Sequence, residues 1–135
     1  MIYAIVLARG GSKGIPKKNI LKFNGKPLIQ YTIEQCINSG IKKIYTSSDD
    51  NEILSLASSL GSKIIHRPEE FSSDNATSES AWIHAIKNIK NIDFNNDWIF
   101  APQVTSPLRD KIDILKAISM AESGLYDSIA SGIEF

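Results

Sequence analysis

The sequence predicts an α/β fold: a mostly parallel, Rossmann-like sheet between two layers of helices. Short apolar runs alternate with amphipathic stretches along the whole chain, as expected of repeated strand–helix units. The apolar runs are continuous rather than alternating, which is typical of parallel strands buried on both faces. The 135 residues, of which 42% are hydrophobic, suit one domain with a single core, residues 1–135.

The first strands and the first helix follow directly from this pattern. Ile2–Leu7 is an uninterrupted apolar run and is expected to form a buried strand. Pro27 can open a helix that Gly40 closes, because proline fits a first helical turn and glycine ends helices. The apolar positions at helical spacing are Leu28, Ile29, Ile33, Cys36 and Ile37. Lys43–Ser47 is expected to be the second strand.

Charges and glycine bound the next elements. Asp49 and Asp50 suit the N-terminus of a second helix, where acidic side chains complement the helix dipole. Gly61 ends that helix. Lys63–His66 is expected to form a short third strand, and the polar residues Glu69–Asn75 a loop.

The second half of the chain continues the alternation. The expected elements are a helix with Trp82, Ile83, Ile86 and Ile89 on one side, a strand at Trp98–Ala101, a turn at Pro102–Pro107, a helix at Asp110–Ser123 and a fifth strand at Ser128–Ile133. The sequence stops just after this last strand without a closing helix. We therefore expect it to be the N-terminal part of a longer domain.

Positive charge is concentrated near the N-terminus. The formal net charge is zero, but residues 1–33 carry six basic residues and no acidic one, whereas the remainder carries nine basic and fifteen acidic residues. This asymmetry favours a local anion site over a generally basic surface. A nucleic-acid partner is not expected, because such proteins combine a strongly basic domain with stacking aromatic residues, and only Phe23 and Tyr31 lie nearby.

Most of this positive charge lies in the loop that follows the first strand. Residues 8–19 contain three glycines and four cationic side chains: Gly10, Gly11, Gly14, Arg9, Lys13, Lys17 and Lys18. Glycine lets the backbone approach a ligand and turn its N–H groups toward it, and the cations supply the charge that a polyphosphate requires. The loop matches neither G-x-x-x-x-G-K-[ST] nor G-x-G-x-x-G. It predicts a nucleoside triphosphate site of another type.

The sequence also predicts a soluble, cytoplasmic protein. Cys36 is the only cysteine, so no intrachain disulfide can form, and its helical position suits a core residue. No stretch approaches the length needed to span a membrane, and the N-terminal apolar run is too short for a signal peptide.

Four blocks in order resemble the acylneuraminate cytidylyltransferases, the CMP-sialic acid synthetases. The blocks are Leu7–Asn19, Thr46–Asp50, Arg67–Phe71 with Asp74–Ser78 and then Ile83–Ala85, and Gln103–Arg109. The last block is similar to the family's Gln-Pro-Thr-Ser-Pro-Leu-Arg segment, with Val104 in place of the first proline. Together the blocks cover nearly the whole chain.

The resemblance implies a nucleotidyltransferase fold and an enzyme that transfers CMP from CTP to the anomeric hydroxyl of a nonulosonic acid, releasing pyrophosphate. It implies catalytic roles for Arg9 and Lys18. It implies substrate-binding roles for Arg9, Gly10, Gly11, Ser12, Lys13, Asn19, Arg67, Ser78 and Gln103. It further implies Mg²⁺, with its ligands after Phe135 and none in this chain, and a homodimer. The acceptor is left open among the nonulosonic acids.

Other interpretations remain open. One alternative is a nucleotidyltransferase that acts on a sugar 1-phosphate and uses another nucleoside triphosphate. The other is a non-catalytic nucleotide-binding module. Lys17, Lys22 and Lys26 suit solvated surface positions, and the Asp49–Asp50 pair suits a helix cap better than a metal. Arg109 is equally suited to bind a ligand or to form an ion pair with Asp110 or Asp113.

Overall fold

The central sheet has four parallel strands in the order β5-β4-β1-β6. The computed structural model describes residues 1–11, 18–73 and 76–131. The strands are β1 (Ile2–Leu7), β4 (Lys43–Ser48), β5 (Lys63–His66) and β6 (Trp98–Phe100). They confirm the first four predicted strands and their parallel pairing. Leu7 lies opposite Ser47 and Ser48 lies opposite His66, so three strands reach their carboxyl ends at the same edge of the sheet.

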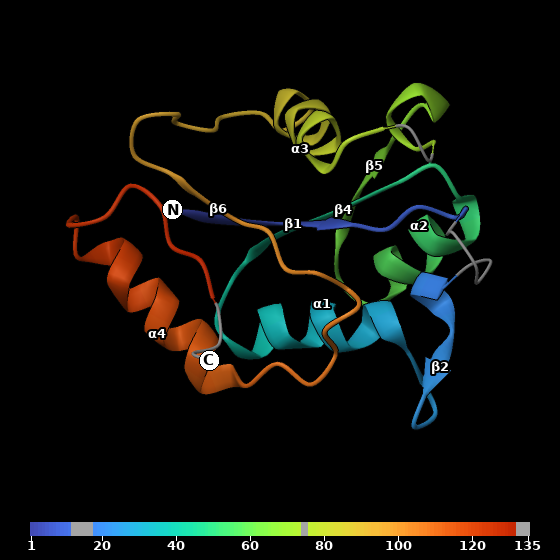
Figure 1. Ribbon diagram of the computed structural model, residues 1–135, viewed down its shortest axis with the longest axis horizontal. Coiled ribbons are helices and arrows are strands. Elements are labelled where there is room, and N and C mark those ends of the chain that lie inside the picture. The colour runs from blue at the N-terminus through green and yellow to red at the C-terminus, as the bar shows by residue number, and fades with distance from the viewer. Residues whose placement is uncertain (12–17, 74–75, 132–135) are drawn as a thin grey trace.

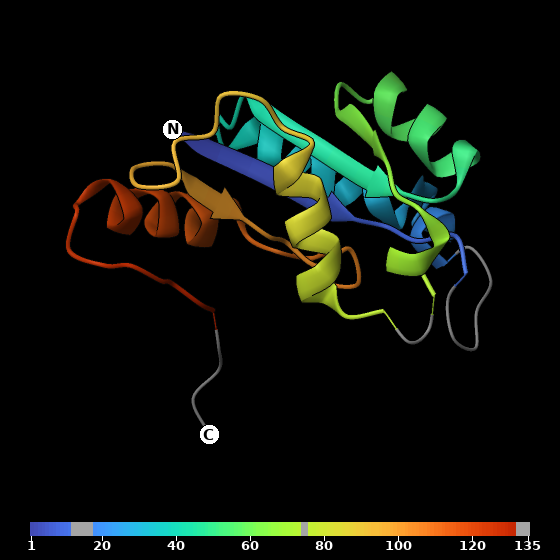
Figure 2. The same cartoon turned by 90° about the horizontal axis from the view of Figure 1, so that it is seen from above.

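Helices cover both faces of this sheet, which confirms the three-layer α/β prediction. α3 (Ser78–Lys87) lies on one face, and α1 (Leu28–Asn38), α2 (Asn51–Ser59) and α4 (Lys111–Glu122) lie on the other (Figure 1, Figure 2). Successive side chains of a strand point to opposite faces. Accordingly, Tyr3 and Ile5 pack with α3, whereas Ala4 and Val6 pack with α4 and α1.

Helix α1 places Cys36 in the core, as predicted. The Cys36 side chain is fully buried beside Ile44 and Ile114. Burial raises the pKa of its thiol to about 12, so the thiol is protonated at neutral pH and is a poor nucleophile. The helix ends at Asn38, and Gly40 follows with φ 84, a conformation that favours glycine.

A small hairpin precedes α1 and was absent from the predicted elements. Strands β2 (Lys22–Phe23) and β3 (Lys26–Pro27) pair antiparallel. Asn24 and Gly25 connect them with φ values of 50 and 83, the positive φ angles of a two-residue hairpin turn. Pro27 therefore ends a strand and precedes α1 rather than forming its first residue. The Asn-Gly pair was the sequence signal for this hairpin.

The fifth predicted strand is wrong for the residues that can be assessed. Residues 128–131 form no strand and are largely exposed, and 132–135 lie outside the described part of the chain. A strand needs a hydrogen-bonded neighbour, and residues 128–131 pair with none of the described strands. Two short 3-10 helices, η1 (Lys18–Ile20) and η2 (Glu69–Phe71), complete the described elements. The second occupies the start of the expected loop Glu69–Asn75.

Asp50 caps α2, and its replacement gives a first test of the structure. Its carboxylate accepts hydrogen bonds from the backbone N–H groups of Glu52 and Ile53, at 2.8 and 3.3 Å. Asp50→Ala is expected to lower the free energy of unfolding by about 1 kcal/mol, because two helix N–H groups lose their acceptor. A thermal melt should show a midpoint lower by about 4 °C. Asp50→Asn is the control and should retain most of the stability; equal losses in both variants would contradict the assignment.

Candidate functional site

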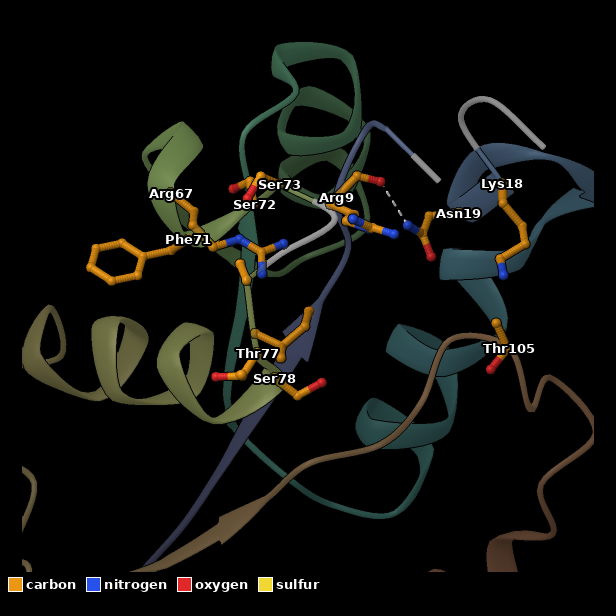
Figure 3. Close-up of a pocket in the computed structure, with 12 residues that line it drawn as sticks. Arg9, Lys18, Asn19, Arg67, Phe71, Ser72, Ser73, Thr77, Ser78 and Thr105 are labelled. Atoms are coloured by element: carbon orange, nitrogen blue, oxygen red, sulfur yellow. Dashed lines mark hydrogen bonds between the residues drawn. The ribbon is translucent and has the colours of Figure 1, made fainter. Parts of the chain in front are cut away.

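A cavity of about 350 Å³ opens at the carboxyl ends of β1 and β5 (Figure 3). Its lining residues are Leu7, Arg9, Lys18, Asn19, Arg67, Phe71, Ser72, Ser73, Ala76, Thr77, Ser78 and Thr105. Five of the predicted site residues are therefore brought together: Arg9, Lys18, Asn19, Arg67 and Ser78. Ligands of parallel α/β sheets bind at this end of the strands, which agrees with the position of the cavity.

The basic loop begins packed against the start of α2. The backbone N–H of Gly10 donates a hydrogen bond to Asp49 Oδ1 at 2.9 Å. A Cβ atom at Gly10 would lie 2.6 Å from Asp50 Oδ2 and 2.8 Å from Asp50 Cβ, so only glycine fits there. The predicted cap role is confirmed for Asp50, whereas Asp49 binds the loop instead. Gly11 is exposed, with open space where a Cβ would be, and is not among the lining residues.

Asn19 brings the other end of the loop back to its beginning. Its side-chain amide donates a hydrogen bond to the Arg9 carbonyl at 2.9 Å, and only 7% of the residue is exposed. This contact, drawn as the dashed line in Figure 3, sets Arg9 beside η1, from which Lys18 reaches the cavity. Ser12 and Lys13 lie outside the described residues, so their predicted contacts stay predictions.

Arg67 is a buried cation in the wall of the cavity. It is 4% exposed, and its backbone N–H donates to the Ser48 carbonyl at 2.8 Å. Its Nη2 lies 3.5 Å from the Ser47 carbonyl oxygen, and its Nε has no partner among the described residues. Burial lowers the pKa of the guanidinium, and the charge of Arg9 lowers it further, against the opposite effect of Asp49. The group still remains charged at neutral pH and has donor capacity for a ligand.

Hydroxyl groups form much of the remaining wall. Thr77 caps α3 by accepting a hydrogen bond from the Ser80 N–H at 3.0 Å, and Ser78 is the first helical residue. The predicted site residues did not include Ser72, Ser73, Thr77 or Thr105. The signal for Thr77 was a hydroxyl residue that precedes the apolar positions of the expected helix at Trp82–Ile89, since threonine is a favoured helix N-cap. A helix N-terminus favours negative charge.

Gln103 is not among the described lining residues of the cavity. Its side chain is exposed, and its backbone carbonyl accepts a hydrogen bond from Arg109 Nη2 at 2.7 Å. Thr105, two residues later, lines the cavity instead. The role predicted for the Gln103 side chain therefore stays a prediction.

The described lining residues carry three cations, Arg9, Lys18 and Arg67, and no carboxylate. Such a site favours an anion. Among the described residues, no group of three or more His, Cys, Asp or Glu side chains is placed to hold a metal ion. Asp49 and Asp50 instead accept hydrogen bonds from backbone N–H groups. Within the same part of the chain, no helix is long and apolar enough to cross a membrane.

The sequence profile of a family described as Cytidylyltransferase matches residues 3–134. The chain belongs to the cytidylyltransferase family. This confirms the predicted resemblance. A pseudaminic acid cytidylyltransferase from Campylobacter jejuni is 44% identical over 114 residues, which are 83% of this chain and 49% of that protein. An N-acylneuraminate cytidylyltransferase from Escherichia coli is 35% identical over 123 residues, covering 90% of this chain and 28% of that protein. The chain thus spans about half or less of these cytidylyltransferases.

Solved structures agree with this family assignment at the level of the fold. The structure of CMP:2-keto-3-deoxy-manno-octonic acid synthetase complexed with CTP matches with a TM-score of 0.76 and 19% identity, covering 91% of this chain and 48% of that one. A cytidylyltransferase from Leptospira borgpetersenii matches with a TM-score of 0.70 and 17% identity, covering 92% and 50%. The predicted nucleotidyltransferase fold is confirmed.

Proposed function

We propose that the protein transfers CMP from CTP to the anomeric hydroxyl of a nonulosonic acid and releases pyrophosphate. The observation that carries the proposal is the cavity at the carboxyl end of the sheet, whose described lining includes Arg9, Lys18 and Arg67 without any carboxylate. Membership of the cytidylyltransferase family supports CTP as the nucleotide. The names of the relatives, which act on pseudaminic acid and on N-acylneuraminate, support a nonulosonic acid as the acceptor.

In this reaction the acceptor oxygen attacks the α-phosphorus of CTP, and the bond from that phosphorus to the pyrophosphate oxygen breaks. The acceptor hydroxyl releases its proton to the solvent, and negative charge develops on the leaving pyrophosphate. Fixed cations stabilise that charge in the transition state. We assign this role to Arg9 and Lys18.

The other assigned residues bind the substrates. We assign triphosphate binding to Lys13, Ser12 and the backbone of Gly10 and Gly11. We assign substrate contacts elsewhere in the cavity to Asn19, Arg67, Ser78 and Gln103.

The proposal includes Mg²⁺, a homodimer and a cytoplasmic location, without a nucleic-acid or membrane partner. The described residues include no group of three or more His, Cys, Asp or Glu side chains that could hold a metal ion, so no Mg²⁺ ligand is assigned among them. No step of the reaction is therefore assigned to a metal. The homodimer and the location follow from the resemblance and the single cysteine, respectively.

A pyrophosphate-release assay tests the proposed function. The protein, with any residues that its gene encodes after Phe135, is mixed with each of four nucleoside triphosphates and with N-acetylneuraminic, pseudaminic or legionaminic acid. Turnover is expected with CTP and at least one of these acids. Release with another nucleotide and a sugar 1-phosphate would favour a different nucleotidyltransferase. No turnover with CTP and any of the acids would reject the proposal.

Two lysine variants sharpen this assay. Lys18→Ala is expected to lower turnover by about 100-fold, since a preorganised cation at the developing charge contributes on that scale. Lys22→Ala removes the same charge from the exposed hairpin and should leave turnover unchanged. Equal effects of the two variants would show that general charge, rather than the position of Lys18, matters.

A further inference from the structure

Arg109 joins the segment after β6 to helix α1. Its Nη1 donates a hydrogen bond to Gln35 Oε1 at 2.6 Å, and its Nη2 donates to the Gln103 carbonyl at 2.7 Å. Gln35 in turn donates from Nε2 to the Pro107 carbonyl at 2.7 Å. Two side chains therefore hold both ends of the turn between Gln103 and Pro107 against α1.

Of the two interpretations left open for Arg109, the ion pair with Asp110 or Asp113 does not form among the described residues. Asp110 instead caps α4, where its carboxylate accepts a hydrogen bond from the Ile112 N–H at 3.0 Å. Burial lowers the pKa of the Arg109 guanidinium. Its two acceptors are neutral oxygens, the side-chain amide of Gln35 and the backbone carbonyl of Gln103. The planar guanidinium group donates its hydrogen bonds in fixed directions. A partly buried guanidinium with neutral acceptors is therefore suited to keeping the backbone that it contacts in one conformation.

The turn held in this way carries a cavity residue. Val104 is 4% exposed and packs in the core cluster with Val6 and Ile33. The Gln103 carbonyl also accepts a hydrogen bond from the Ser106 N–H at 3.2 Å, which closes the turn around Thr105. Figure 3 shows Thr105 on the side of the cavity where Lys18 lies, away from Arg67 and Phe71.

We propose that Arg109 is a positioning residue that, through the Gln103 backbone and together with Gln35, holds Thr105 at the reacting end of the cavity. This inference rests on the proposed function, because the reacting end is defined by the role assigned to Lys18. Arg109 itself does not line the cavity. Its loss should therefore disturb the alignment of the reacting groups more than the affinity for CTP.

The test measures kcat, the Kd for CTP and the thermal midpoint of Arg109→Lys and Arg109→Ala. Arg109→Lys keeps the charge and the aliphatic stem but not the two-pronged donor, so it should fold and lose about tenfold in kcat, because small misplacements near reacting groups are costly. Arg109→Ala should lose at least as much. The Kd for CTP should stay unchanged in both variants. Lys111→Ala, which removes a nearby exposed cation, is the matched control and should behave as the wild type.

A double-mutant cycle with Gln35→Ala tests whether the two side chains act together. The double variant should lose less kcat than the product of the single losses, as expected for residues in one hydrogen-bond network. Unchanged kcat in both Arg109 variants, or a Kd for CTP weakened by the same factor as kcat, would overturn the inference while leaving the proposed function intact. A wild-type protein without turnover on CTP and any nonulosonic acid would reject both.

Discussion

Replacing Arg67 with methionine is expected to weaken CTP binding by about 10- to 100-fold, because a hydrogen bond to a charged group contributes about 1.5–3 kcal/mol. Arg67 is 4% exposed, lines the cavity and has a donor at Nε without a partner among the described residues. A guanidinium in this position can donate to an acceptor on the ligand without first giving up a strong protein partner. Isothermal titration calorimetry with CTP measures the effect.

The same substitution should not destabilise the ligand-free protein. Burial lowers the pKa of Arg67, which means that the protein environment disfavours its charge. Its one side-chain hydrogen bond among the described residues is long, at 3.5 Å. Removing an incompletely paired buried charge in favour of an apolar side chain of similar length is often neutral or stabilising. We therefore expect a thermal midpoint equal to or above that of the wild type.

Arg67→Lys is the matched variant for this prediction. Lysine keeps the charge but cannot reproduce the planar donor set, so CTP affinity should fall to an intermediate value. A loss of affinity in Arg67→Met that is accompanied by a thermal midpoint several degrees lower would mean that Arg67 supports the fold instead. Wild-type affinity in Arg67→Met would remove Arg67 from the site.

The fold was predictable because its elements are marked locally. Uninterrupted apolar runs such as Ile2–Leu7 indicate buried parallel strands, and helix ends carry their own residues, such as Asp50 and Gly40. The prediction of a fifth strand was wrong because a strand needs a neighbouring strand for its backbone hydrogen bonds. Apolar residues in the sequence do not show whether such a neighbour is present. The hairpin at Asn24 and Gly25 also has a local signal, the Asn-Gly pair, but it was absent from the predicted elements.

The candidate site was predictable only in part, for a different reason. Arg9 and Asn19 belong to one loop, so their proximity followed from the sequence. The family resemblance predicted that Arg67 and Ser78 belong to the same site, and all four residues line the cavity. The position of Thr105 depends on a turn that is held by contacts to another helix. Arg109 and Gln35 are 74 residues apart in the sequence. Neither the helical periodicity around Gln35 nor the motif that contains Arg109 indicates that the two side chains are in contact.

Gly10→Ala is expected to have a large effect on both stability and binding, because the new Cβ has no space. It would lie 2.6 Å from Asp50 Oδ2 and 2.8 Å from Asp50 Cβ. A rotation of the Asp50 side chain could move the oxygen but not the Cβ, so the backbone of the loop or of the α2 N-terminus must shift. That shift would disturb the hydrogen bond from Gly10 to Asp49 and the Asp50 cap. We expect the free energy of unfolding to fall by about 1–3 kcal/mol, the usual cost of overpacking.

The loss of CTP affinity in Gly10→Ala should exceed what unfolding explains, since Arg9 precedes the displaced residue and lines the cavity. Thermal melts and calorimetry at a temperature where the variant is folded separate the two effects. Gly11→Ala is the matched control, because a Cβ there meets nothing within 4 Å, and it should retain wild-type stability.

A second substitution tests the cause of the Gly10→Ala defect. Asp50→Gly removes the clashing Cβ. By itself, glycine in place of aspartate at a helix N-cap lowers the free energy of unfolding by only roughly a few tenths of a kcal/mol. If the Cβ–Cβ contact is responsible, the double variant Gly10→Ala with Asp50→Gly should be more stable than Gly10→Ala alone, even though Asp50→Gly by itself weakens the cap of α2. If the two losses simply add, the close approach between Gly10 and Asp50 does not control this loop. Rescue would instead identify the approach of the β1 loop to the start of α2 as the contact that sets the position of Arg9.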